Sequence, residues 1–374
     1  MNQSGFPLSD AERLSWLRLI RSDNVGPATF RDLLRRFGNA SAALDGLPAL
    51  AGGGGRTGRL RIPSKAEAER ELAAIATAGA RLVALPDPDY PPLLAEVEAP
   101  PPLLILKGHT GLLARPTLAI VGARNASAAG IRFARDLSRA LGEAGLVVVS
   151  GLARGIDRAA HEGAMATGTV GVLAGGIDVV YPPEHEALQA RIGAEGVLVA
   201  EMPPGTVPQA RSFPRRNRIV AGLSLGVLVV EAALKSGSLI TARMAGEIGR
   251  EVMAVPGSPL DPRCRGANDL IRQGAALVEE VADVLGALGE LRGKTISEQR
   301  LGRVSGEGAA MVPDEAELAR GRVLIDGLLG PTPVEVDELM RQTDLTPPVV
   351  LTILLELELA GRLARHAGNR VAWA

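Results

Sequence analysis

The sequence predicts an α/β protein whose central domain is a doubly wound, mostly parallel β-sheet. Short uncharged apolar runs have the length and valine content of buried strands, at residues 118–121, 146–149, 170–173, 197–200, 225–230 and 252–255. Stretches with helical periodicity alternate with these runs, as between residues 126 and 144. The first two runs each end in a glycine-bearing loop that opens a helix, which is the arrangement of a βαβ unit in a parallel sheet.

Length, charge and composition narrow the class of partner. A chain of 374 residues can form two or three domains with a sizeable core. Its 41 basic and 42 acidic residues give a net charge of −1, so a nucleic acid would have to be held by a local basic patch. Aromatic residues make up 2% of the chain, too few for an extensive base-stacking platform. The single cysteine, Cys264, excludes an internal disulfide and a cysteine-rich zinc site.

The sequence also indicates a compartment. The first residues lack the basic segment and apolar core of a signal peptide. No stretch of about twenty apolar residues is present to span a bilayer. We therefore expect a cytoplasmic protein without a membrane partner.

A small helical domain is expected over residues 1–80. Apolar residues recur at helical spacing on both sides of the turn Asn24-Val25-Gly26-Pro27. Two helices around such a turn resemble a helix-hairpin-helix, whose turn amides can contact a nucleic-acid phosphate; a helical packing module is the alternative. The main domain is expected over residues 81–288, with two further strands at residues 82–85 and 103–106.

A flexible linker and a C-terminal domain are expected to follow. Residues 289–317 lack periodicity and are rich in glycine and charge, which predicts a linker. Residues 318–374 show three helical segments and a possible β-wing, which resembles a winged-helix domain. The third helical segment has no basic residue before Arg362 and carries Glu356 and Glu358, so it is poorly equipped to read DNA. A protein-contact or dimer-supporting role is favoured.

Two glycine-bearing loops of the main domain predict an anion site. The loops Gly122-Ala123-Arg124-Asn125 and Ser150-Gly151 through Gly155 each precede a helix, whose free N–H groups and positive end favour an anion. Both lie at the carboxyl edge of the sheet, where ligands bind. The first loop is not a G-x-G-x-x-G fingerprint, and the chain contains no P-loop, so nucleotide binding is not indicated at this edge. The alternative is that the glycines only permit tight turns. Arg124 and Arg154 weaken this alternative, because turn geometry does not require arginine.

Two further basic features extend this edge. Four arginines fall between residues 211 and 218, just before another expected strand, in the segment that holds Arg215, Arg216, Asn217 and Arg218. The loop Lys235-Ser236-Gly237-Ser238 follows that strand, and Ser238 is the expected N-cap of the next helix. A solvated charged face and an unliganded capping turn are the respective alternatives. Together the loops and arginines predict a basic groove at the sheet edge.

No catalytic constellation is evident, and we expect neither an enzyme activity nor a cofactor nor a bound metal. The four histidines, His109, His161, His185 and His366, lack metal-ligand spacing. Asp157 and His161 are expected to cap and brace a helix. Glu201 and Glu231 end strands near the crevice and supply the enzymatic alternative, a nucleotide or nucleoside-phosphate hydrolase.

Six motifs of the main domain resemble those of the DNA-processing protein A family, DprA/Smf. In order these are VGARNASAAG, SGLARGIDRAAH, GGIDVVYPPEH, FPRRNRIVAGLS, VVEAALKSGSLITA, and AVPG followed by NDLIRQGA. The resemblance implies an extended Rossmann-like domain that binds single-stranded DNA, forms a homodimer and loads the recombinase RecA during natural transformation. It carries over no catalytic residue.

The resemblance also implies where DNA would lie. The family's pocket falls on Arg124 and Lys235, with the turn of residues 215–218 beside them. Combined with the loop residues, the expected DNA-binding set is Gly122, Arg124, Asn125, Ser150, Gly151, Arg215, Arg216, Asn217, Arg218, Lys235, Ser236, Gly237 and Ser238. One departure is Ala267, where many relatives have a cysteine or hydroxyl residue; we expect it to leave DNA binding intact.

Overall fold

The structure is a computed structural model that describes residues 8–54, 60–298, 314–366 and 368–374. The chain forms two compact units. One unit is built from residues 70–303, and the other combines the N-terminal part up to residue 69 with the C-terminal part from residue 304. The two units are described separately below.

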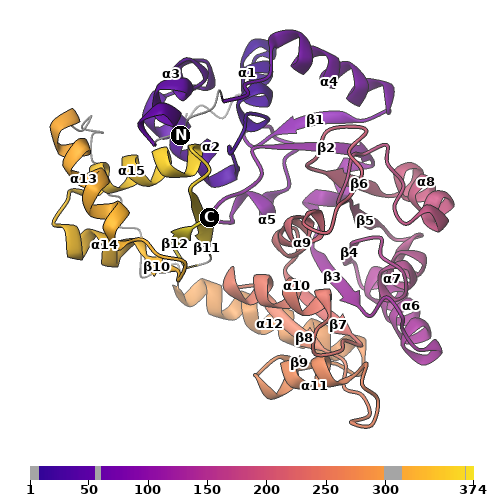
Figure 1. The fold of residues 1–374 in the computed structure, drawn as a ribbon. Helices are drawn as coiled ribbons and strands as arrows, with labels where there is room; N and C mark the ends of the chain where they lie inside the picture. The colour runs from indigo at the N-terminus through magenta and orange to yellow at the C-terminus, as the bar shows by residue number, and fades with distance from the viewer. Residues whose placement is uncertain (1–7, 55–59, 299–313, 367) are drawn as a thin grey trace. The chain divides into compact units, whose positions relative to one another are not determined.

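The unit of residues 70–303 is built on one sheet, to which nine strands of the described chain contribute in the order β1-β2-β6-β5-β4-β3-β7-β8-β9 (Figure 1). The strands from β6 to β9 in this order are parallel, whereas β2 pairs antiparallel with both β1 and β6. Their bounds are β1 Arg81–Ala84, β2 Leu103–Gly108, β3 Thr117–Gly122, β4 Val147–Ser150, β5 Thr169–Val172, β6 Val197–Ala200, β7 Gly226–Val230, β8 Glu251–Ala254 and β9 Ala276–Leu277.

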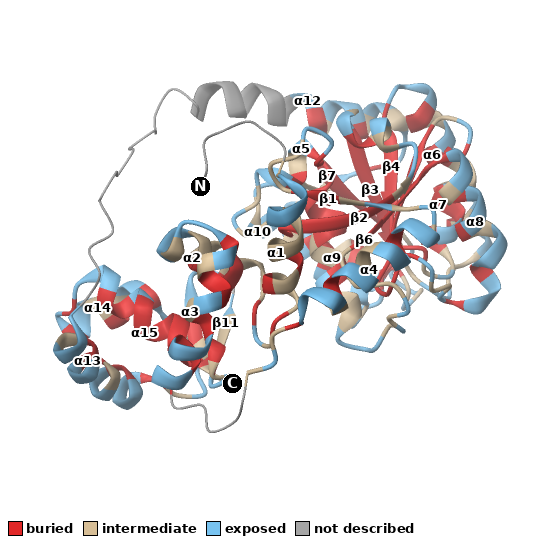
Figure 2. Ribbon diagram, turned by 90° about the horizontal axis from the view of Figure 1, so that it is seen from above, coloured by how far each residue is buried: buried red, intermediate tan, exposed pale blue. Residues whose placement is uncertain are grey.

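Helices cover both faces of this sheet and bury its valine-rich strands (Figure 2). Side chains that alternate along a strand point to opposite faces, so Ala119 and Val121 of β3 pack in one core cluster and Leu118 and Ile120 in the other. The first face carries α5 Pro92–Ala95, α9 Ser212–Gly222, α10 Gly237–Glu247 and α11 Arg265–Arg272. The opposite side carries α4 Lys65–Thr77, α6 Ala128–Glu143, α7 Ile156–Ala164, α8 Glu186–Glu195 and α12 Val281–Glu298.

The predicted doubly wound sheet is confirmed, and each predicted strand is present within one or two residues. The sequence did not predict β9, whose two residues are too short to give a periodic signal. Residues 215–218 were expected to form a turn before a strand, and this is wrong: they lie within α9. Helix α12 continues to Glu298, into the stretch predicted as a linker; residues 299–313 of that stretch lie outside the described residues.

The other unit contains the expected N-terminal helical domain. Helix α1 Asp10–Ile20 begins with a capping box in which the Ser9 side chain accepts from the Glu12 amide and Glu12 reaches back to the Ser9 amide. Helix α2 Pro27–Phe37 starts with proline at its first position, and α3 Ala40–Gly53 is capped by Asn39. Their apolar faces form one cluster around Leu19, Leu33 and Leu47.

The C-terminal part of this unit is a winged helix, as expected. It contains α13 Glu315–Leu328, α14 Val336–Thr343 and α15 Pro347–Leu359. Strands β10 Val334–Glu335, β11 Leu363–His366 and β12 Arg370–Trp373 form an antiparallel sheet in the order β10-β12-β11. A second leucine- and valine-rich cluster fills its interior. Among the described residues, no helix is both long and apolar enough to cross a bilayer.

Candidate nucleic-acid interface

The candidate site lies where the strand order of the sheet reverses. From β3 the chain proceeds through β4, β5 and β6 on one side, and from β7 through β8 and β9 on the other. The carboxyl ends of β3 and β7 therefore flank the topological switch point, which is where open α/β sheets bind ligands. Gly122, the last residue of β3, allows β3 and β7 to approach closely, because a Cβ at this position would overlap the carbonyl oxygen of Val230. The loops after β3 and β7 are thus held side by side.

A cleft of about 680 Å³ opens at this edge of the sheet. Most of the residues predicted from the sequence line it: Gly122, Arg124, Asn125, Gly151, Arg216, Asn217, Lys235, Ser236, Gly237 and Ser238. Three predicted residues do not. Ser150 is fully buried, and its hydroxyl donates to the Ile120 carbonyl at 2.6 Å. Arg215 and Arg218 lie on α9 outside the lining.

The first anion site expected from the sequence is already filled by a carboxylate of the chain. Glu231, directly after β7, accepts from the Ser127 amide at 2.9 Å and from the Ser127 hydroxyl. Ser127 in turn caps α6 by accepting from the Gly130 amide at 2.9 Å. The positive end of α6 therefore faces Glu231, and a DNA phosphate placed there would meet a like charge. The expectation that this helix end is free for a ligand is wrong.

The same holds for the second loop. The carboxylate of Asp157 accepts from the amides of Gly151 and Ala153, both at 3.2 Å. Asp157 is buried, and burial raises the pKa of this carboxyl group, which the nearby Arg216 opposes. The expectation that Asp157 caps its own helix is wrong: no side chain caps the start of α7, and the Asp157 carboxylate binds the loop that precedes the helix. Because Asp157 accepts from these two amides, they are not available to an added phosphate.

The third loop differs, because no acidic residue lies in the first turn of α10. Its N-cap is Ser236, not Ser238 as predicted: the Ser236 hydroxyl accepts from the Ser238 amide at 3.4 Å and lies 2.7 Å from the Ser238 hydroxyl. Lys235 and Gly237 are exposed beside this helix end. The Lys235–Ser238 loop is therefore the one of the three expected anion sites that no carboxylate of the described chain occupies.

The arginines of α9 have three different environments. Arg216 is buried, with its Nη1 donating to the carbonyls of Gly151 and, at 2.7 Å, Val172. It thereby ties α9 to the ends of β4 and β5. Arg218 forms an ion pair with Glu201, and Arg215 is exposed to solvent. Only Arg215 presents its charge outward, because consecutive helix positions point in different directions.

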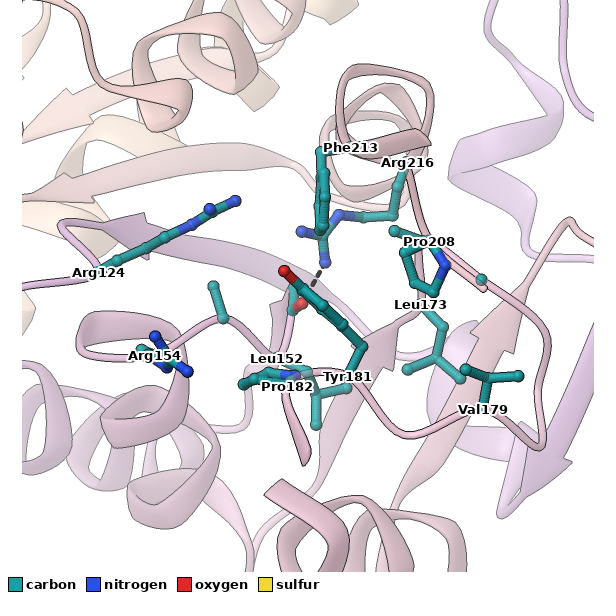
Figure 3. A pocket seen from close by; sticks show the side chains of 14 residues that line it. Arg124, Leu152, Arg154, Leu173, Val179, Tyr181, Pro182, Pro208, Phe213 and Arg216 are labelled. Carbon is teal, nitrogen blue, oxygen red and sulfur yellow. Dashed lines mark hydrogen bonds between the residues drawn. The ribbon is translucent and has the colours of Figure 1, made fainter. Parts of the chain in front are cut away.

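A smaller pocket adjoins the cleft and contains two aromatic rings (Figure 3). The rings of Tyr181 and Phe213 lie 5.6 Å apart at an interplanar angle of 50°. The exposed Arg124 lies over the Phe213 ring, with its guanidinium carbon 5.1 Å from the ring centroid. Arg154 lines the same pocket and pairs with Glu184. Tyr181 was not predicted as a site residue, although it is part of the motif GGIDVVYPPEH.

The two carboxylates of the enzymatic alternative are engaged within the chain. Glu201 pairs with Arg218, and Glu231 caps the start of α6 through Ser127. Across the described residues, no group of three histidine, cysteine, aspartate or glutamate side chains is placed to hold a metal ion. Within the described part of the chain, both carboxylates therefore already have partners in the protein.

The buried imidazole of His161 makes the stability of the sheet domain depend on pH, and this dependence can be measured. His161 is fully buried, with Nδ1 2.7 Å from the Thr169 hydroxyl, as its expected bracing role requires. Burial, reinforced by Arg216 and His185, lowers the His161 pKa from 6.5 to about 3. Below pH 6.5 the unfolded chain binds a proton that the folded chain does not. The stability due to neutral His161 is therefore complete above pH 6.5 and declines by about 1.4 kcal/mol per pH unit as the pH falls toward 3.

We expect His161→Asn to remove this decline, whatever its effect at neutral pH. In urea unfolding, the difference in unfolding free energy between pH 7 and pH 5 should be smaller than wild type by about 2 kcal/mol. His109 is exposed, so His109→Asn should keep the wild-type difference. Equal differences in wild type and His161→Asn would show that the buried imidazole does not resist protonation.

Comparison with known proteins supports the motif resemblance. The family model for DNA recombination-mediator protein A matches residues 81–289, more than half of the chain. Models for a DprA-like N-terminal HHH domain and a DprA winged helix domain match residues 10–74 and 307–369. The chain belongs to the DprA/Smf family.

Individual relatives agree with the assignment to DprA/Smf. Protein Smf of Escherichia coli is 39% identical over 285 residues, which cover 75% of this chain and 74% of that protein. Protein Smf of Synechocystis is 42% identical over 213 residues, 55% of this chain; the match spans only about half of that relative, 53%.

Two solved structures of DNA processing protein A share the fold. The structure from Streptococcus pneumoniae is 32% identical, with a TM-score of 0.63 over 75% of this chain and 98% of that chain. The structure from Helicobacter pylori is 30% identical, with a TM-score of 0.50 over 54% of this chain and 93% of that chain. The description of the Helicobacter structure concerns the single-stranded DNA binding mode of that protein.

Proposed function

We propose that this protein binds single-stranded DNA along the carboxyl edge of its sheet. The observation that carries the proposal is the open start of α10, where Lys235 stands beside a cleft that Arg124 also lines. Neither cation has an ion-pair partner among the described side chains. The relative from Helicobacter pylori, whose single-stranded DNA binding mode is described, supports the same substrate class.

The phosphates would be held by side chains more than by loop amides. Lys235, the Ser236–Ser238 segment and Arg124 surround the cleft, and Arg215 extends the positive charge along α9. Gly122, Asn125 and Gly151 form part of the cleft wall, while Ser150 is buried and donates to the Ile120 carbonyl. Arg216 would act as a positioning residue, because its guanidinium group contacts carbonyl groups inside the protein. Asn217 would fix the start of α10, since its amide donates to Gly237 at 3.4 Å.

The bases would be contacted at the pocket beside the cleft. Tyr181 is 44% exposed, and its ring and that of Phe213 offer apolar surface on which a nucleobase can stack. A strand whose phosphates follow Lys235 and Arg124 would bring a base to this pair, because Arg124 and Phe213 line both the cleft and the pocket.

Substitution of the aromatic pair tests this part of the proposal. We expect Tyr181→Ala and Phe213→Ala each to weaken single-strand binding by about 1–3 kcal/mol, while the salt dependence stays unchanged because no phosphate contact is lost. Fluorescence anisotropy at several salt concentrations measures both quantities. Phe133→Ala is the control, since Phe133 lies on α6 beside a different cavity. Wild-type affinity in both variants would remove stacking from the account.

Downstream roles complete the proposal. We infer that the protein acts in DNA uptake and recombination as a non-enzymatic, cytoplasmic mediator that self-associates and loads RecA, in line with its family. Light scattering tests self-association, and RecA filament formation on protein-coated strands tests loading.

Binding of short single- and double-stranded oligonucleotides, with and without nucleotide, tests the proposal as a whole. We expect single strands to bind more tightly than duplexes, with no effect of nucleotide, because a rigid duplex cannot follow loops along a twisted sheet edge.

A further inference from the structure

We propose that the winged helix serves as an intramolecular partner of the N-terminal helices and does not read DNA. Its third helix, α15, is the contact. Val349, Ile353 and Leu357 point into the winged-helix core. Leu355 and Leu359 belong instead to the apolar cluster of α1, α2 and α3. One helix therefore completes two cores that are about 300 residues apart in the chain.

Polar groups fix the register of this contact. The Arg36 guanidinium on α2 donates to the Thr352 hydroxyl at 2.7 Å, and the Asn24 amide donates to the Leu359 carbonyl at 3.0 Å. Arg365 of β11 pairs with Asp32 of α2 at 3.1 Å. These contacts are directional and connect side chains with specific groups across the seam, which distinguishes the arrangement from loose apolar association.

A buried charge pair lies under the end of α3. Glu356 is 3% exposed, and both of its oxygens accept from Arg322 of α13, at 2.8 and 2.9 Å. Gly53 and Gly54 cross directly above this pair: a Cβ on Gly54 would overlap the Glu356 carbonyl oxygen. Arg362 adds a hydrogen bond to the Gly54 carbonyl at 3.4 Å. The N-terminal helices thus approach α15 more closely than any side chain at residue 54 allows.

This contact removes the surface with which a winged helix reads DNA. A reading helix must place exposed side chains in the major groove. In the segment Pro347–Leu359 no residue is basic, and the exposed positions are Pro347, Pro348 and Leu351. The arginines that flank α15 are also paired with carboxylates, as the bonds of Arg362 with Asp326 and of Arg365 with Glu358 show. The helix offers DNA neither a free face nor a positive charge.

The inference is independent of the proposed single-strand site, and its test does not use that site. A protease site is introduced between residues 303 and 314 of the full-length protein, the chain is cut, and gel filtration measures how much of the C-terminal fragment remains bound. We expect the fragment to co-elute with the rest of the wild-type protein. Gly54→Val should weaken its retention at least tenfold, because the added side chain overlaps the Glu356 carbonyl, while the φ of −76° at this C-cap lies on the negative side that residues other than glycine adopt.

Gly52→Val is the matched control. Gly52 lies in the same last turn of α3, and a Cβ there meets nothing within 4 Å. This variant adds the same side chain without overlapping a neighbour, so it should retain the fragment as wild type does. The double variant Asn24→Ala, Arg36→Ala provides a second route, since it deletes two cross-seam hydrogen bonds without adding bulk. It should weaken retention by about tenfold.

Three outcomes would overturn the inference. The first is release of the fragment from the cut wild-type protein. The second is full retention in Gly54→Val and in the double variant. The third is a gain of tenfold or more in duplex-DNA affinity when Gly54→Val is introduced into the uncut chain, which would show that the uncovered α15 does read DNA.

Discussion

Replacing Arg124 or Lys235 by alanine is expected to weaken single-stranded DNA binding by about tenfold for every sequence. Both side chains line the open cleft, and under the proposed function each would neutralise phosphate charge there; a charge-assisted hydrogen bond contributes about 1.5–3 kcal/mol. Each lost contact should also make the log–log dependence of affinity on salt shallower by about 0.7, which is the counterion release per phosphate of a single strand. Binding isotherms between low and moderate salt measure both effects together.

Arg154→Ala is the internal control for these variants. Arg154 is exposed near the same pocket, and its charge is paired with Glu184, whose hydrogen bond raises the Arg154 pKa. Its removal should leave the salt slope unchanged. If Arg124→Ala and Lys235→Ala both kept the wild-type affinity and slope, the open start of α10 would not be where the strand is held.

Arg216→Ala is expected to destabilise the sheet domain by about 2–5 kcal/mol. The substitution leaves the carbonyls of Gly151 and Val172 without their buried donor, and each such loss costs about 1–3 kcal/mol. It also removes the opposite charge that offsets the burial of Asp157. Urea unfolding monitored by circular dichroism gives the change directly.

Arg215→Ala is the matched comparison, because Arg215 precedes Arg216 on α9 and is exposed. Its effect on unfolding should stay within about 0.5 kcal/mol, as for most surface substitutions, while its salt slope should become shallower. The pair thereby separates a supporting role from a DNA contact. Equal stability in both variants would contradict the supporting role of Arg216.

The sheet could be predicted from the sequence because its signal is local. Buried parallel strands are short apolar runs, and the runs that become β3, β4 and β7 are uncharged and rich in valine. The sequence also showed Gly122, which ends β3, and Gly151, which follows β4. Strand β9 lacked such a signal, because it consists of Ala276 and Leu277 alone.

The chemistry of the site depended on contacts that local patterns do not show. Glu231 binds the start of α6 through Ser127, which is 104 residues away in the sequence. The sequence could not show this contact, so the first loop was predicted to be an open anion site. Asp157 closes the second loop in a similar way. The burial of Arg216 had a usable signal: in a helix it shares a face with Ile219 and Val220, both buried. We expected a turn at residues 215–218, and a turn does not have this helical spacing.

The seam between the two ends of the chain had no sequence signal. The apolar residues of α15 follow from the pattern of residues 347–359, but the pattern cannot say that Leu355 joins the cluster of the N-terminal helices and not that of the winged helix. The acidic residues of this helix favour a role other than reading DNA, and this stays a prediction. Glu356 pairs with Arg322 inside the unit.

Photocrosslinking of a single strand that carries iododeoxyuridine tests the central claim most directly, because this base couples to nearby aromatic side chains and the chain has only nine. Tyr90 is buried, whereas Trp16, Phe30, Phe37 and Trp373 belong to the unit that contains the winged helix. The account predicts that mass spectrometry finds the crosslinks in peptides containing Tyr181 or Phe213, and that Lys235→Ala reduces their yield. Crosslinks at Trp16 or Trp373 with none at Tyr181 or Phe213 would contradict it.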